Sequence, residues 1–145
     1  MSTASASLSG CVTRATIPAL DLERARHFYA EVLGLRAVLE TPGGVVFESG
    51  GDAGAAGPGW APASTFLVFP TPNPARGNHT QMGFLVKEIE TRVAELTARG
   101  VVFEAYDLPG MKTENGVASI LNGRGKAAWF KDSEANIIGL VEFAE

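Results

Sequence analysis

The sequence has few of the residues that bind metals or form covalent cross-links. Its 145 residues include two histidines and one cysteine, Cys11. A single cysteine cannot form a disulfide within the chain, and no general base lies beside Cys11 in the sequence, so we expect neither a cross-link nor a catalytic thiol. Because histidine is the commonest metal ligand and general base, two histidines leave few positions for either kind of site.

Other kinds of segment are missing as well. The 12 lysines and arginines against 16 acidic residues give a net charge of −4, which argues against the clustered cations that bind nucleic acid. No run reaches the roughly 18 apolar residues of a membrane span. Residues 1–10 contain neither a basic segment nor a long apolar one, so a disordered tail is expected there rather than a signal peptide. The sequence predicts a cytoplasmic protein that binds neither nucleic acid nor membranes.

What the sequence does contain is a regular succession of strands and helices. Alternation of residue types predicts a strand over residues 12–20, followed by a helix with Asp21 as its N-cap and Gly34 at its end. A loop rich in Gly, Ala and Pro is predicted over residues 50–62. Three further strands are predicted, at residues 35–40, 45–49 and 65–69.

The same pattern begins again after a proline-rich connector. A strand is predicted over residues 79–86 and a helix over residues 88–99, followed by extended structure over residues 101–107. The dipeptide Asn122–Gly123 predicts a hairpin turn. The strands expected around and after that turn cover residues 117–121, 126–131 and 137–143.

The two halves are an internal repeat. Leu22, at the start of the first helix, corresponds to Ile89 of the second helix at a spacing of 67 residues. A half of this size cannot cover both faces of its sheet, so we expect the halves to pack together or against another chain. The predicted division is a first module at residues 11–70, a linker at residues 71–78 and a second module at residues 79–145.

Two segments resemble a known family. Residues 17–35, IPALDLERARHFYAEVLGL, look like the opening of the vicinal oxygen chelate superfamily, and residues 129–140, WFKDSEANIIGL, are similar to its closing strand, turn and strand. That superfamily includes glyoxalase I, extradiol dioxygenases, and bleomycin- and fosfomycin-resistance proteins. The resemblance covers about residues 12–143. It implies an α+β fold in which two βαβββ modules in one chain form a curved mixed sheet around a cleft, in a homodimer.

The resemblance also implies where a metal would bind. Metal-dependent members take ligands from the first and the last strand of each module. The corresponding positions here are Arg14, Phe69, Gln81 and Gly139. Arginine is a permanent cation, while phenylalanine and glycine offer no side-chain donor atom, so only Gln81 has an oxygen to contribute. The nearest other donors in the sequence are His79 and Glu142. We therefore expect no bound metal and no other cofactor.

The same cleft positions are candidates for binding a small-molecule ligand. Arg14 is expected either to bind a carboxylate, phosphate or phenolate, or to form an internal salt bridge with Glu48, Glu104 or another acid. Gln81 is expected either to hydrogen-bond a ligand carbonyl or to satisfy Arg14. The apolar side chains form either a wall for a flat ligand or part of the core, and they are Phe69, Tyr106 and Trp129, with Met111 beside them.

Three other features have alternative roles. Trp60, in the predicted loop, is expected to be buried locally, in a dimer interface or over the cleft. Residues 108–116 are predicted to be either a lid that contains Met111 and Lys112 or a solvated loop. His79 is expected to cap a strand or lie in solvent rather than to take part in catalysis.

The turn before the last strand contains an unusual residue. Members of the superfamily commonly have glycine where Ala135 stands. In the left-handed conformation an alanine costs on the order of 1 kcal/mol. We expect the turn to shift so that Asn136 adopts that conformation instead.

Three functions are compatible with these features. The leading prediction is a metal-independent protein that binds an aromatic or anionic compound in the cleft, similar to the drug-binding resistance proteins of the superfamily. The alternatives are a lyase, isomerase or dioxygenase of the glyoxalase type with an altered metal site, and a dimeric scaffold with a vestigial cleft. Binding is ranked first because it needs no proton transfer and the cleft offers few bases.

Overall fold

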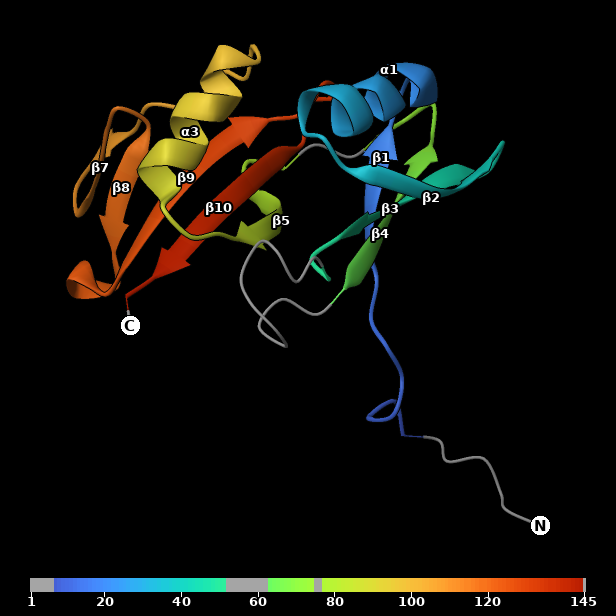
Figure 1. Ribbon diagram of the computed structural model, residues 1–145, viewed down its shortest axis with the longest axis horizontal. Helices are drawn as coiled ribbons and strands as arrows, with labels where there is room; N and C mark the ends of the chain where they lie inside the picture. Colours follow the sequence, from blue (N-terminus) through green and yellow to red (C-terminus); the bar gives the residue numbers. More distant parts are fainter. Residues whose placement is uncertain (1–6, 52–62, 75–76, 145) are drawn as a thin grey trace.

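Two modules, each with a sheet of its own, make up the structure of the protein (Figure 1). The structure is a computed structural model that describes residues 7–51, 63–74 and 77–144. Trp60, most of the predicted 50–62 loop and the first six residues of the predicted tail lie outside the described residues. Both sheets contain parallel and antiparallel pairs. The predicted α+β class with two βαβββ modules is confirmed.

The first module places one helix against a four-stranded sheet. Strand β1 (Ala15–Ala19) leads through Asp21 into helix α1 (Leu22–His27), which continues as the π-helical turns η1 (Phe28–Val32). The Asp21 carboxylate accepts a hydrogen bond from the backbone N–H of Arg24 at 3.0 Å, as predicted for the N-cap. The sheet has the order β1-β4-β3-β2, with β1 parallel to β4. Its other strands are β2 (Arg36–Thr41), β3 (Gly44–Ser49) and β4 (Ser64–Pro70).

The second module repeats this arrangement and extends it. Strand β5 (Thr80–Leu85) precedes helix α3 (Ile89–Ala98) and lies parallel to the last strand, β10 (Ile137–Phe143). The sheet has six strands in the order β5-β10-β9-β8-β7-β6. A short 3₁₀ turn at Leu121–Gly123 joins β8 to β9, which confirms the hairpin predicted there. The remaining strands are β6 (Asp107–Leu108), β7 (Met111–Glu114), β8 (Val117–Ile120) and β9 (Gly125–Lys131).

The extra hairpin is the main departure from the predicted elements. Residues 108–116 were expected to be a lid or a solvated loop, but β6 pairs with β7, and β7 pairs with β8. The dipeptide Asn115–Gly116 has positive φ at both residues, which is the geometry of a tight hairpin turn. The strands are too short and polar to show an alternating apolar pattern, so this turn was the signal that sequence reasoning missed.

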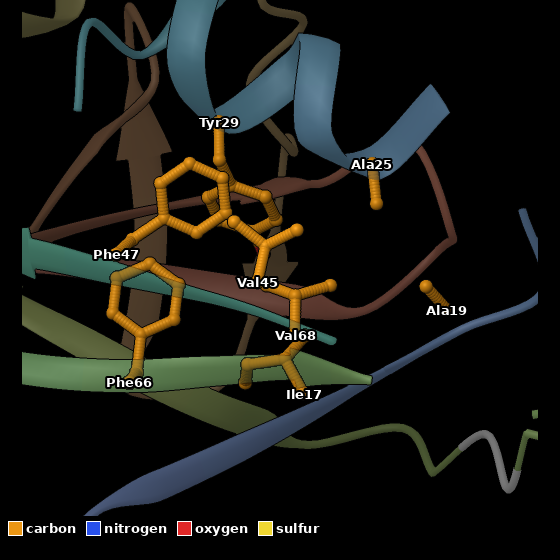
Figure 2. Packing of buried hydrophobic residues seen from close by; sticks show 8 residues of the cluster. All are labelled: Ile17, Ala19, Ala25, Tyr29, Val45, Phe47, Phe66 and Val68. Carbon is orange, nitrogen blue, oxygen red and sulfur yellow. The ribbon is translucent and has the colours of Figure 1, made fainter. Parts of the chain in front are cut away.

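Each helix covers one face of its own sheet and buries a core there (Figure 1). In the first module Tyr29 packs against Phe47 and Phe66, with ring centroids 5.6 and 5.4 Å away. Figure 2 shows these rings between the helix and the strands, with aliphatic side chains beside them. The second core is built from Ile89, Val93, Val101, Ala128, Phe130, Ile138 and Leu140.

The two cores meet at a seam between the modules. Four partly buried side chains, from the first helix and from β5, pack against both cores: Phe28, Leu33, Met82 and Phe84. Among the described residues, no helix covers the opposite faces of the two sheets. The modules pack together, which is one of the two arrangements that the repeat predicted.

Candidate functional site

The residues predicted to bind a ligand lie on the sheet faces opposite the helices, which we call the open faces. Successive side chains of a strand point to opposite faces. Val68 and Phe130 are buried in the two cores, so their neighbours Phe69 and Trp129 point to the open faces. Gln81, next to Met82, follows the same alternation on β5. Strand alternation thus points Phe69, Gln81 and Trp129 away from the helices.

Tyr106 and Trp129 form an aromatic pair on the second open face. Their ring centroids are 5.5 Å apart and the rings meet edge to face at 74°. The backbone of Tyr106 is fixed by Thr113 of β7, whose hydroxyl accepts from the Tyr106 N–H at 2.9 Å. Both aromatic side chains are half-buried. Neither the Tyr106 hydroxyl nor the Trp129 indole N–H makes a hydrogen bond to another residue in the described part of the chain.

Two glycines lie in line with this aromatic pair. Gly83 of β5 is the register partner of Gly139 in β10, and Gly139 is the partner of Trp129 in β9. A Cβ atom built on Gly139 would lie 3.5 Å from the indole Nε1 and 3.3 Å from a methyl group of Thr80. The edge of the indole therefore lies beside the place where a side chain at position 139 would stand. Gly83 and Gly139 therefore place two residues without side chains next to each other, in line with the indole ring.

The residues at the expected metal positions do not fit a metal ion. Arg14, Phe69, Gln81 and Gly139 supply one neutral oxygen among them. Within the described ranges, no group of three or more His, Cys, Asp or Glu side chains is arranged to hold a metal. Glu142, the nearest acid to Gly139 in the sequence, accepts from the backbone N–H groups of Glu88 and Ile89 at 2.9 and 3.1 Å and so caps helix α3.

Arg14 is exposed and lies just before β1. Its Nε donates to the Thr65 hydroxyl at 3.2 Å. The expected salt bridges to Glu48 and Glu104 are not formed, because Glu48 pairs with Arg36, and Glu104 pairs with Lys131 at 3.6 Å. The guanidinium has five donors, so most of them are not used by the described protein atoms.

The candidate residues fall into two groups on different sheets. Arg14 and Phe69 belong to the first sheet, whereas Gln81, Tyr106 and Trp129 belong to the second. Among the residues that the structure describes, no hydrogen bond or ring contact joins the two groups. The Gln81 amide makes no side-chain hydrogen bond to them either, so it does not satisfy Arg14.

The remaining predicted residues, Met111, Lys112 and His79, lie outside these two groups. Met111 is half-buried and Lys112 exposed, both in β7. His79 is exposed, and its ring lies against Gly77, where a Cβ would come within 2.4 Å of Nδ1. His79 therefore lies in solvent, one of the two placements expected for it.

Comparison with known proteins identifies the family. Residues 12–132 match the Glyoxalase/Bleomycin resistance protein/Dioxygenase superfamily. The chain belongs to this superfamily. The resemblance found in the sequence is therefore confirmed. No curated protein sequence matches the chain.

Solved structures share the superfamily fold with this chain at low sequence identity. Lactoylglutathione lyase from Agrobacterium tumefaciens is 22% identical with a TM-score of 0.56, over 92% of this chain and 93% of that one. TnmS3, an antibiotic binding protein from Streptomyces sp. CB03234, is 19% identical with a TM-score of 0.58, over 92% and 98%. Integron cassette protein HFX_CASS4, from the mobile metagenome of Halifax Harbour Sewage Outfall, is 14% identical with a TM-score of 0.65, over 92% and 99%. These likenesses show the fold alone.

A polar network at the seam was not predicted from the sequence. The turn between β9 and β10 places the Asp132 carboxylate where it accepts from the Tyr29 hydroxyl at 2.6 Å and from the Asn136 side-chain amide at 2.8 Å. That amide also donates to the Pro18 carbonyl at 2.9 Å. The network ties the closing motif of the second module to the opening motif of the first. Tyr29, Asp132 and Asn136 lie within the two segments that resemble the family, but their spacing in the sequence does not show that they are in contact.

Glu134 in the same turn forms a salt bridge across the seam. Its carboxylate is fully buried and accepts from Arg24 Nε at 2.7 Å and Nη2 at 3.0 Å. It also accepts from the backbone N–H of Asp21 and the hydroxyl of Ser133, each at 2.9 Å. Burial acts to raise the pKa of Glu134, but the hydrogen bonds from these donors outweigh it and lower the pKa to about 2. The carboxylate is therefore charged at neutral pH.

The predicted turn conformation was wrong. Ala135 itself has a φ of 70° and takes the left-handed position, whereas Asn136 does not. Asn136 is held by its bonds to Asp132 and Pro18, including a backbone N–H that donates to the Asp132 carboxylate at 2.9 Å. Those three bonds fix Asn136, so the strain falls on the alanine before it.

Three cavities in the described part of this superfamily member lie away from the predicted ligand residues. Their volumes are about 670, 470 and 450 Å³. None of them is lined by the five residues predicted to bind a ligand, Arg14, Phe69, Gln81, Tyr106 and Trp129.

Within the described segments no helix is both long enough and apolar enough to cross a membrane.

Proposed function

We propose that this protein binds a small aromatic or anionic molecule at its open faces without a metal ion. The observation that carries the proposal is the Trp129 indole, whose edge lies beside Gly139, a position where the superfamily resemblance implies a metal ligand. The indole offers both a flat apolar surface and an N–H that donates to no described residue. Tyr106 packs edge-on against it and adds a second aromatic surface. TnmS3, which has the same fold, is an antibiotic binding protein.

The polar contacts are assigned to Arg14 and Gln81. A guanidinium binds a carboxylate, phosphate or phenolate through parallel N–H bonds, and Arg14 uses one donor on the Thr65 hydroxyl. The Gln81 amide supplies a donor and an acceptor for a ligand carbonyl or hydroxyl. Phe69 adds apolar surface on the first sheet. Met111 and Lys112, in the hairpin beside this region, are proposed to contact the ligand from the edge of the second sheet.

Homodimerisation is part of the proposal. Within the described residues β1 and β5 end their sheets on one side, and strand edges favour pairing. Leu85 on β5 is 66% exposed, although it is a large apolar side chain. A second copy that covers it would remove apolar surface from water. Sedimentation velocity is expected to show a dimer, and Leu85→Lys is expected to shift the protein towards a monomer. A monomer at all concentrations would contradict this part.

Ligand binding is tested with 1-naphthoate, a flat aromatic anion. In a Trp60→Phe background Trp129 is the remaining tryptophan, so quenching of its fluorescence reports binding beside it. Arg14→Gln is expected to weaken binding about fivefold or more because the charged contact is lost. Arg124→Gln, at another exposed arginine, is the matched control and is expected to leave binding unchanged.

Two results would overturn the proposal. A broad panel of aromatic anions that neither quenches Trp129 nor raises the melting temperature would favour the scaffold alternative. Stoichiometric nickel, zinc or iron in the purified protein, measured by plasma mass spectrometry, would favour the enzyme alternative.

A further inference from the structure

A groove lies at the seam between the modules and is distinct from the predicted ligand residues. Its volume is about 470 Å³, within the usual range for small-molecule sites. The apolar lining includes Phe84 at the seam, Leu96 on α3, and Phe130 and Leu140 from the second core. Since Phe130 and Leu140 are buried core residues, the groove reaches down to the hydrophobic interior.

The lining carries an excess of positive charge. Lys87, Arg92 and Arg99 line the groove together with one acid, Glu95. Without Lys87, which has another interaction partner, the two arginines against one carboxylate still leave an excess of one positive charge, in a chain whose net charge is −4. Arg92 and Arg99 are seven residues apart, two helical turns, so they stand on the same face about 10 Å apart. An apolar floor with cations at its side suits a molecule that has an apolar part and an anionic group.

Arg99 is held in place across the seam. Its Nη1 donates to the Val32 carbonyl of the first module at 3.4 Å. It also lies over Gly34, where a Cβ atom would be 3.2 Å from the same nitrogen. Gly34 has a φ of 74°, a conformation that favours glycine. This contact fixes the guanidinium beside the groove while four of its five donors make no hydrogen bond to the described residues.

We propose that this groove binds a small amphipathic carboxylate, such as a medium-chain fatty acid. The carboxylate is bound by the free donors of Arg99 through parallel N–H bonds, with Arg92 adding attraction at longer range. The alkyl chain lies against Phe84 and Leu96 and removes their apolar surface from water. The site uses none of the five residues predicted to bind a ligand at the open faces, although Leu85, proposed above as a dimer contact, is also one of its lining residues.

Isothermal titration with octanoate tests the proposal. Octanol has the same chain without the charge, and acetate has the charge without the chain, so both are expected to bind at least about tenfold more weakly than octanoate. Arg99→Gln is expected to weaken octanoate binding about tenfold, and Arg99→Lys to have an intermediate effect because it keeps the charge but not the planar fork. Arg92→Gln is expected to weaken binding about threefold.

Two controls keep the result specific. Arg124→Gln is expected to leave octanoate binding unchanged, and so is Trp129→Leu, which alters only the open face. If Arg99→Gln lowers the melting temperature, its weaker octanoate binding could come from a destabilised fold. Arg92→Gln then tests the site, because the Arg92 side chain makes no hydrogen bond to the described residues. Absence of saturable octanoate binding, equal affinity for octanol, unchanged affinity in Arg92→Gln and Arg99→Gln, or loss of binding in Trp129→Leu would each overturn the proposal.

Discussion

Arginine and tyrosine side chains occur both at the seam between the modules and on the open faces. They differ in how many hydrogen bonds they make to other described residues. Arg24 at the seam donates twice to the buried carboxylate of Glu134, whereas Arg14 at the open face donates once to the Thr65 hydroxyl. Tyr29 at the seam is fully buried and donates to Asp132, whereas the Tyr106 hydroxyl has no partner among the described residues. Arginine and tyrosine therefore stabilise the fold in one region and are left available in the other.

The difference separates stability from binding in this protein. Where the modules meet, every fully buried polar side-chain atom in the described chain has a hydrogen-bond partner, as required when polar groups leave water. On the open faces, polar groups keep donors and acceptors that a ligand or a second copy can use. Substitutions at the seam should thus reduce the free energy of unfolding, and equivalent substitutions on the open faces should not.

Asp132→Ala is expected to have the largest effect. The Asp132 carboxylate accepts from the Tyr29 hydroxyl, the Asn136 amide and two backbone N–H groups of its own turn. Its removal leaves these buried donors unpaired and should lower the free energy of unfolding by about 4 kcal/mol in urea denaturation. Asp107→Ala, at an exposed aspartate, is the control and should cost less than about 0.5 kcal/mol. Equal losses in the two variants would contradict the distinction.

The pH dependence of stability tests Glu134. Its pKa of about 2 in the folded protein lies below the ordinary value of 4.5. The folded state therefore holds the charged form better, so this carboxylate stabilises the fold fully above about pH 4.5 and progressively less as the pH falls towards 2. Glu134→Gln should cost about 2.5 kcal/mol at pH 7, and its difference from the wild type should shrink between pH 4.5 and 3. Glu31→Gln, at an exposed glutamate, should cost little at any pH, and a constant difference for Glu134→Gln would contradict the assignment.

The two tyrosines allow a direct comparison of the regions. Tyr29→Phe removes a donor from the buried Asp132 carboxylate and should lower the free energy of unfolding by about 1.5 kcal/mol. Burial, with Asp132 beside it, raises the pKa of Tyr29 well above its ordinary value, so the hydroxyl stays protonated and donates throughout the neutral range. Tyr106→Phe should change stability by less than about 0.5 kcal/mol. A larger loss in Tyr106→Phe than in Tyr29→Phe would show that the open face also stabilises the fold.

The fold was largely predictable because it depends on local patterns. Asp21 and Gly34 delimit the first helical segment through capping and a left-handed C-terminal position, which are short-range effects. Strand β10 was predicted with the bounds that the structure shows. The hairpin of β6 and β7 was missed because its strands are two and four residues long, too short for a periodic signal.

The candidate site was predictable only in part. Tyr106 and Trp129 were named as apolar candidates for either a ligand wall or the core, and their edge-to-face contact appears only in the structure. The partners of charged groups were not predictable, because Arg24 and Glu134 are 110 residues apart and meet only when the modules pack. The same applies to Arg14, which contacts Thr65 rather than Glu48 or Glu104.

Ala135 offers a smaller, stabilising change within the seam. It holds a φ of 70° next to the fixed Asn136. Ala135→Gly should relieve this conformation and raise the free energy of unfolding by about 0.5–1 kcal/mol, after the entropy that glycine adds to the unfolded chain. Thermal unfolding at neutral pH measures the change, with Ala105→Gly at an exposed position as the control. A lower melting temperature for Ala135→Gly would show that the alanine methyl contributes packing that outweighs the strain.

Arg14→Gln should have the smallest effect on stability, and that small effect is what distinguishes the two regions. Its single bond to the Thr65 hydroxyl lies at an exposed site, where solvent replaces it readily, so the free energy of unfolding should change by less than about 0.5 kcal/mol. Arg24→Gln removes two donors from a buried carboxylate and should reduce stability clearly. If Arg14→Gln proves as costly as Arg24→Gln, Arg14 belongs to the structural network after all. A variant that unfolds like the wild type yet binds 1-naphthoate more weakly would instead identify a cation that is dispensable for the fold and used for the ligand.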